Sequence, residues 1–275
     1  MVSINTNPGA LIALQNLTRI NGDLEDVQRR VSTGLEVSSA RDNPALFALA
    51  QNQRAELGSI ESVQQGLRIG VSTVDVALAA GESVSDILIN LRAVASQAAD
   101  PSISAENRAL LTAEFISLRD QIERTVDSAE IGGRNLLANG ASDLTLVAST
   151  DGSDTITVAA QNFSIGGGII DIDNTTGPLD TVADAQAQLT AIEDAIEASS
   201  TAVAALGAGS RSFELQGDLL TRISDTLEVS IGNLVDADLA RESSRLQALQ
   251  VQQQLAIQTL SIANATPNSI LALFA

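Results

Sequence analysis

The sequence contains no cysteine, histidine, lysine, tyrosine or tryptophan. Without cysteine and histidine, the chain can form no disulfide, no thiolate nucleophile and no zinc site built from those two ligands. Acid-base or nucleophilic chemistry would have to rest on aspartate, glutamate, serine, threonine and arginine. We therefore predict that the protein is not an enzyme and that it holds no cofactor.

Paired carboxylates are the remaining candidates for hydrolytic chemistry, since two acids can together hydrolyse a glycoside. The pairs are Asp151 with Asp154 and Asp171 with Asp173. Neither pair lies in a sequence context typical of a pocket. We interpret both as solvated acids in turns.

Residues 171–177, DIDNTTG, carry acids at alternate positions, as calcium-binding loops do. An EF-hand loop needs glycine where Thr176 stands and glutamate where Val182 stands. Because both positions depart from that pattern, we predict no metal site here.

Basic charge and long apolar runs are also scarce. The 15 basic residues are all arginine, and 34 acidic residues bring the formal net charge to -19. Such a charge repels nucleic acid and anionic membranes, so we predict neither as a partner. No stretch approaches the roughly 18 unbroken apolar residues of a membrane span, and the N-terminus lacks the features of a cleaved secretory signal. If the protein leaves the cell, we expect another route.

The residues that are present favour long helices. Hydrophobic residues make up 44% of the chain and aromatic residues only 2%, which is typical of extended helix seams. Apolar residues near the N-terminus recur at steps of three and four: Leu14, Leu17, Ile20, Leu24, Val27 and Val31. A similar stripe near the C-terminus comprises Leu246, Leu249, Ala256 and Leu260, widened by Leu255, Ile257 and Ile262. We predict that the two terminal helices pair and that their surplus apolar surface contacts other copies.

Capping signals place the starts of three further helices. Asn43, followed by a proline, begins a helix that extends to about residue 100. Ser104 begins the next, which we expect to stop at residues 131–133. Thr181 and Asp184 form a capping box before a long heptad pattern that continues to about residue 234 despite two glycines.

Two short segments change the period from helical to alternating. Residues 143–148 and 154–160 alternate apolar and polar side chains on either side of Asp151-Gly152, which predicts a β-hairpin. The fold class is therefore mainly α: an elongated antiparallel helical bundle or coiled coil with long rods, a small β-hairpin region at one pole and paired N- and C-terminal helices at the other.

Three parts follow from these breaks. Residues 1–42 with 236–275 would form a terminal coiled-coil domain, and residues 43–140 with 179–235 a helical rod domain. Residues 141–178 would be a short, outward-facing variable segment of the rod domain.

Three segments resemble bacterial flagellin. They are QRRVSTGLEVSSARDNPALFALA near the N-terminus, LGAGSRSFELQGDLL at 206–220, and DADLARESSRLQALQVQQQLAIQTLSIANATPNSILALF from residue 236. The resemblance covers about residues 1–135 and 180–275. It implies a filament subunit for swimming motility, exported unfolded by the flagellar type III apparatus and polymerised at the filament tip.

The resemblance also implies partners and a location. The partners would be other subunits of the same chain, the filament cap protein, the hook-associated junction proteins and an export chaperone at the C-terminal helix. The protein would be secreted into the extracellular filament, with the terminal pair forming the inner tube. From the residues themselves we expect terminal helices with surplus apolar faces to be largely disordered in the monomer and to fold on docking.

Many flagellins carry a segment that a vertebrate innate immune receptor reads, and LINLRAVASQ at 88–97 is its equivalent here. Leu88, Arg92 and Gln97 stand within it, but Asn90 and Ala93 replace an arginine and a glutamate of the family's segment. These replacements remove one charge of each sign. We predict weak or absent recognition by the receptor.

Two other interpretations stay open at this point. A hook-filament junction protein of the same export system would share terminal helices of this type. A cytoplasmic coiled-coil scaffold would share the rods. The scaffold differs from the filament subunit in that the purified chain would not form long filaments.

Overall fold

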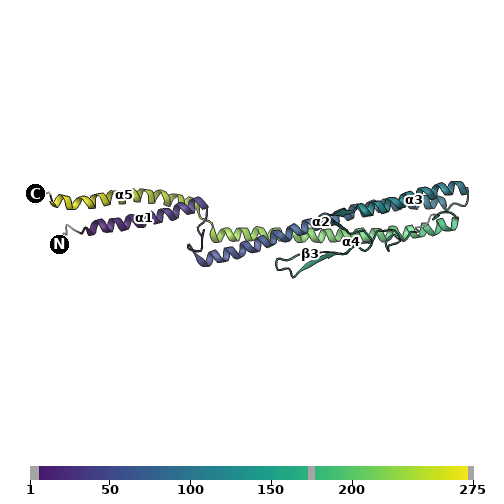
Figure 1. The fold of residues 1–275 in the computed structure, drawn as a ribbon, viewed down its shortest axis with the longest axis horizontal. Helices are drawn as coiled ribbons and strands as arrows, with labels where there is room; N and C mark the ends of the chain where they lie inside the picture. Colours follow the sequence, from purple (N-terminus) through teal and green to yellow (C-terminus); the bar gives the residue numbers. More distant parts are fainter. Residues whose placement is uncertain (1–5, 173–176, 272–275) are drawn as a thin grey trace. The chain divides into compact units, whose positions relative to one another are not determined.

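The structure is a computed structural model that describes residues 6–172 and 177–271 (Figure 1). In order, the elements are α1 (Pro8–Thr33), α2 (Pro44–Ala98), α3 (Ala105–Ser128), β1 (Glu130–Ile131), β2 (Arg134–Asn135), β3 (Leu144–Val147), β4 (Thr155–Val158), α4 (Val182–Val235) and α5 (Leu239–Leu271). This element content confirms the predicted mainly α class with a small hairpin region.

The chain divides into two compact units, a terminal unit of Met1–Leu57 with Asp225–Ala275 and a central unit of Gly58–Ser224. The division falls inside α2 and α4, so each of these helices contributes to both units. The domain boundaries expected at residues 42 and 236 coincide with breaks between helices and stay a prediction. The expected placement of the hairpin and of the terminal helices at opposite poles also stays a prediction.

The predicted caps are confirmed by the side-chain contacts at the helix starts. Asn43 Oδ1 accepts from the backbone N–H groups of Ala45 and Leu46, at 3.2 and 3.1 Å. Ser104 Oγ accepts from the Asn107 N–H at 3.3 Å. The Thr181 and Asp184 side chains each accept from the other's backbone N–H at 3.1 Å, which is the reciprocal pattern of a capping box.

The end of α3 differs from the expectation. The helix stops at Ser128, and Gly132 and Gly133, with φ of 58° and 80°, form the two-residue turn between β1 and β2. Two successive positive φ angles are the geometry of a type I′ hairpin turn, which glycine adopts without steric cost. Asn135 then caps the helix end, because its Nδ2 donates to the Val126 carbonyl at 2.6 Å.

The predicted hairpin is confirmed as β3 paired antiparallel with β4, with Leu144 opposite Val158. It lies against two glycines of the central unit. A Cβ added at Gly209 of α4 would stand 2.6 Å from Val158 Cγ2, and one added at Gly70 of α2 would collide with Leu146 Cδ1. The glycines therefore let the hairpin side chains reach the helix backbones.

The turn between α2 and α3 is fixed by Arg108, which is buried. Its Nε donates to the carbonyl of Ala98 at 3.0 Å and its guanidinium also donates to the carbonyl of Asp100 at 3.2 Å. The Ala98 carbonyl lies at the C-terminal end of α2, where no helical N–H is available to it and a cation is favourable. The Asp100 carbonyl lies just beyond the helix and also accepts from the Ile103 N–H at 3.3 Å.

In the terminal unit, the two breaks between helices are joined by backbone hydrogen bonds. The N–H groups of Glu36 and Val37 both donate to the Val235 carbonyl, at 2.7 and 3.2 Å, and the Ala237 N–H donates to the Gly34 carbonyl at 2.9 Å. The segment after α1 therefore pairs with the segment after α4.

Candidate functional site: the apolar faces of the terminal helices

Residues from the two ends of the chain meet in one seam between α1 and α5. Ile20, Leu24 and Val27 of α1 are buried with Leu249 of α5. Val31, Leu246 and Ala256 pack against this cluster. Seven of the residues expected on the two stripes therefore lie together.

Polar contacts flank the seam. Gln253 Nε2 donates to Asn21 Oδ1 at 2.8 Å, and Asn7 Nδ2 donates to the Ala263 carbonyl at 2.7 Å. Arg30 lies 3.6 Å from Glu242, whose Oε2 is buried and has no hydrogen-bond partner. The pairing of α1 with α5 thus rests on a small apolar cluster and a few polar contacts.

The remaining apolar side chains of α5 face away from α1. Val251, Leu255 and Ile262 are 56%, 57% and 64% exposed. With about 3.6 residues per turn, these three fall on the side of α5 opposite Leu249 and Ala256. A helix that is apolar on opposite faces is typical of a buried position, so this subunit alone leaves α5 partly uncovered.

Further apolar side chains are exposed outside this stripe: Leu11, Ile12 and Leu14 on α1, and Leu239 and Ile257 on α5. Leu14 therefore lies outside the seam, where Ala13 is buried in its place. Leu17 and Leu260 are half-buried.

Sequence reasoning missed Leu11, Ile12 and Val251. The signal was there for Val251, which stands four residues before Leu255 and eleven before Ile262, on the same helix face.

The segment equivalent to the receptor-binding stretch lies on α2. Leu88 is fully buried, whereas Asn90, Arg92, Ala93 and Gln97 are exposed. Arg92 Nε stands 3.8 Å from a carboxylate oxygen of Glu193 on α4, a loose and solvent-exposed ion pair. The two positions that depart from the family's segment thus lie on the accessible side of the helix.

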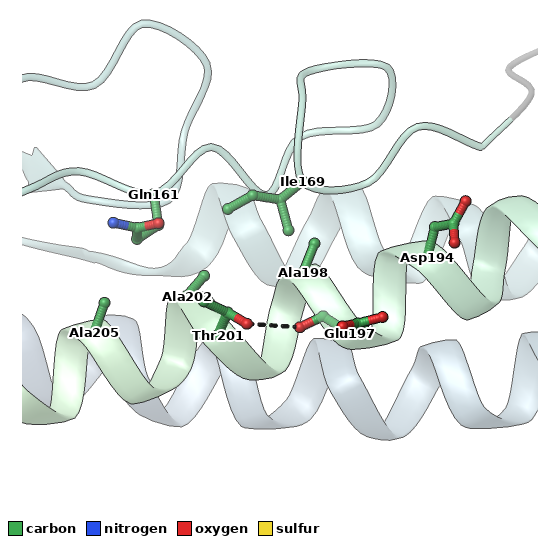
Figure 2. A pocket seen from close by; sticks show the side chains of 8 residues that line it. All are labelled: Gln161, Ile169, Asp194, Glu197, Ala198, Thr201, Ala202 and Ala205. Atoms are coloured by element: carbon green, nitrogen blue, oxygen red, sulfur yellow. Dashed lines mark hydrogen bonds between the residues drawn. The ribbon is translucent and has the colours of Figure 1, made fainter.

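A hollow of about 480 Å³ lies over α4 and is shown in Figure 2. Asp194, Glu197 and Gln161 supply its polar lining, together with small apolar side chains. The hydrogen bond drawn there runs from Thr201 Oγ1 to the Glu197 backbone carbonyl, 3.1 Å, and so belongs to the helix itself.

Asp151, one of the candidate acids, organises the β3–β4 turn. Its Oδ1 accepts from Ser149 Oγ at 2.6 Å and from the N–H and Oγ of Ser153 at 3.1 and 2.9 Å. The Ser149 bond, followed by those from Ser153, lowers the pKa of Asp151 to about 2. These bonds hold the two sides of the turn together through the Asp151 carboxylate.

The other candidate acids fall partly outside the described residues. Asp173 and Thr176, and with them most of the calcium-like segment 171–177, belong to the part that the structure does not describe. Across residues 6–172 and 177–271, no group of three or more acids is arranged to hold a metal ion. Nor is any helix in those ranges both long and apolar enough to cross a membrane.

Comparison with known families decides what kind of chain carries this surface. Residues 4–142 match the bacterial flagellin N-terminal helical region, and residues 189–274 match the bacterial flagellin C-terminal helical region. The chain belongs to the bacterial flagellin family. Flagellins are the structural subunits of the flagellar filament, and the predicted resemblance and filament role are confirmed.

Individual relatives support the same family over the full length. Flagellin FljO of Caulobacter vibrioides is 42% identical over 273 residues, which cover 99% of this chain and 98% of that relative. The flagellin of Brucella melitensis is 38% identical over 287 residues, covering 100% and 99%. These matches favour a flagellin over the hook-filament junction protein and over the scaffold.

A solved structure supports the fold. The putative flagellar hook-associated protein from Vibrio parahaemolyticus aligns with a TM-score of 0.61 and 17% identity, covering 71% of this flagellin and 100% of that chain. At this identity the likeness concerns the fold alone, including the shared helical architecture.

Proposed function

We propose that this flagellin docks onto neighbouring subunits through the apolar faces that α1 and α5 leave exposed. The observation that carries the proposal is the stripe of Val251, Leu255 and Ile262 on the side of α5 opposite its seam with α1. Burying the exposed half of each such side chain contributes roughly 1 kcal/mol. Several of them per subunit, repeated along a filament, would supply the burial that one chain lacks.

The terminal helices complete their folding on assembly. Among the side chains that the structure describes, the buried cluster between these two helices of 26 and 33 residues has four members, with Ala13 buried beside it. Helices held by so small a core are marginal in water. A subunit whose ends are unfolded before docking suits export in unfolded form through the flagellar type III apparatus. The same exposed face of α5 offers an export chaperone an apolar surface.

The other partners and the location follow from the filament role. The cap protein would hold the arriving subunit at the tip, the hook-associated junction proteins would precede it, and the assembled protein would be extracellular. The subunit acts as a structural component and not as an enzyme, without cofactor, nucleic acid or membrane as partner.

The test replaces the exposed stripe of α5 with glutamine, as V251Q/L255Q/I262Q, in the full chain. Glutamine keeps helix propensity while it removes apolar surface. The variant should remain in the supernatant in a sedimentation assay under conditions that polymerise the unmodified chain, with the monomer's circular dichroism unchanged. The control, V251L/L255I/I262L, keeps the surface apolar and should sediment. Normal polymerisation of the glutamine variant would remove this stripe from the interface.

A further inference from the structure

Three hydrogen-bonded pairs of polar side chains join α2 to α4 inside the central unit, and we call them the polar ladder. Its rungs are Ser85 with Ser199 at 2.8 Å, Asp75 with Ser210 at 2.9 Å, and Gln64 with Thr221 at 3.2 Å. Successive rungs stand ten or eleven residues apart on α2 and eleven apart on α4. Eleven residues span about three helical turns, so the rungs share one face of each helix.

One set of buried positions on the same two helices, apolar apart from Ser199, has a different period. Buried positions repeat every seven residues, as Ile60, Leu67, Val74, Gly81, Leu88 and Ala95 on α2, and as Ala185, Ile192, Ser199, Leu206, Phe213 and Leu220 on α4. A seven-residue pattern superimposes on itself when one helix slides by seven residues. The seven-residue repeat alone therefore distinguishes poorly between the native alignment and one shifted by seven.

The polar ladder does distinguish the native alignment from the shifted ones. Its rungs are spaced by ten or eleven residues, so a slide of seven residues brings no rung residue opposite a rung residue of the other helix. Shifted by seven residues in one direction, Ser85 would face Leu206, and in the other direction it would face Ile192. Asp75 would likewise lose its hydroxyl partner. The buried members of these two rungs are Ser199 and Ser210, and in either shifted alignment each loses the side chain to which it bonds. A buried hydroxyl that loses its partner is unfavourable, so both shifted alignments are disfavoured.

We propose that the polar ladder is a register lock, which confines two long heptad-patterned helices to one antiparallel alignment (Figure 1). Two of its rungs, Ser85 with Ser199 and Asp75 with Ser210, each contain a buried serine, and we call them the buried rungs. Ser199 has no exposed surface and Ser210 has little. Buried polar pairs at helix interfaces contribute to specificity of register more than to stability. The lock acts within the central unit and holds whether or not the terminal helices fold on assembly.

The test compares a ladder-free chain with a matched control. The ladder-free chain is S85A/S199A/D75A/S210A, which removes both side chains of each buried rung, so that no polar side chain of these rungs is left without its partner. The control is S72A/S212A, which removes two exposed hydroxyls that bond only to carbonyls of their own helices. Helical content is followed by circular dichroism.

Cysteine pairs report the alignment, because the chain has no cysteine of its own. Q64C/T221C places thiols at the exposed rung and reports the native alignment. Q64C/E214C reports the shift of seven residues that would place Ser85 opposite Ile192. Each pair is placed in the unmodified, ladder-free and control backgrounds and treated with a short thiol cross-linker.

In the unmodified and control backgrounds, only the pair at 64 and 221 should cross-link efficiently. In the ladder-free background the chain should remain helical, and the pair at 64 and 214 should now cross-link as well. Cross-linking at the native pair alone in the ladder-free chain would overturn the proposal. If that chain loses helix, the smaller variant S85A/S199A is tested in the same way, and its unfolding would also overturn the proposal because the rung would then serve stability.

Discussion

Gly209 of α4 is a position where one added methyl group should crowd the contact between α4 and the hairpin. In Gly209→Ala the new Cβ would lie 2.6 and 2.8 Å from the two methyl groups of Val158 and 3.3 Å from its Cβ. Val158 is buried in β4 and β-branched, so its side chain has few rotamers to move into. The strand must shift away from the helix instead.

The expected magnitude combines two opposing effects. Alanine is favoured over glycine in a helix interior by about 0.5–1 kcal/mol, whereas an extra methyl in a packed contact costs about 1–3 kcal/mol. The matched control is Gly217→Ala in the same helix, where an added Cβ meets nothing within 4 Å. Gly217→Ala should therefore stabilise the unit, and the two variants should differ by about 1–3 kcal/mol, the cost of the crowded contact.

Thermal and denaturant unfolding of the full chain, followed by circular dichroism, measures this difference. For a unit of this size it corresponds to about 2–4 °C in Tm per kcal/mol. Truncating the strand residue in Gly209→Ala/Val158→Ala should remove most of the penalty that the helix substitution adds, because the clashing methyl groups are gone. Equal shifts for Gly209→Ala and Gly217→Ala would refute the reasoning that the hairpin rests on the backbone at Gly209.

Three further outcomes are expected. Asp151 should titrate at about pH 2 by NMR and at a higher pH in Ser149→Ala; since its pKa is depressed, its support of the hairpin turn is complete above the ordinary aspartate pKa and is lost as pH falls toward 2. Arg108→Met keeps an apolar stem but leaves the Ala98 carbonyl at the end of α2 without its donor, and should lower the free energy of unfolding by about 1–3 kcal/mol. Asn90→Arg/Ala93→Glu restores both charges that the family's receptor segment carries and should raise a reporter-cell response above that of the unmodified flagellin. Equal responses would contradict the assignment of those positions.

Much of the proposed docking surface was predictable because terminal apolar residues at steps of three and four define a helix face without reference to other elements. Leu255, Ile257 and Ile262 were expected outside the seam, and the structure leaves them exposed. The choice between Leu14 and Ala13 as the seam residue was not predictable. It depends on the rotation of α1 against α5, which the packing of both helices sets.

Local sequence patterns were enough to predict the starts of α2, α3 and α4, the β3–β4 hairpin and the family. Caps such as Asn43 and Ser104 act on N–H groups two or three residues away, so their effect can be read locally. The tertiary structure alone decided that the glycines after α3 turn a second hairpin, that Gly209 receives Val158, and that Ser85 finds Ser199. Each of these contacts depends on how segments pack in space, and a pattern along one segment carries no information about the partner opposite it.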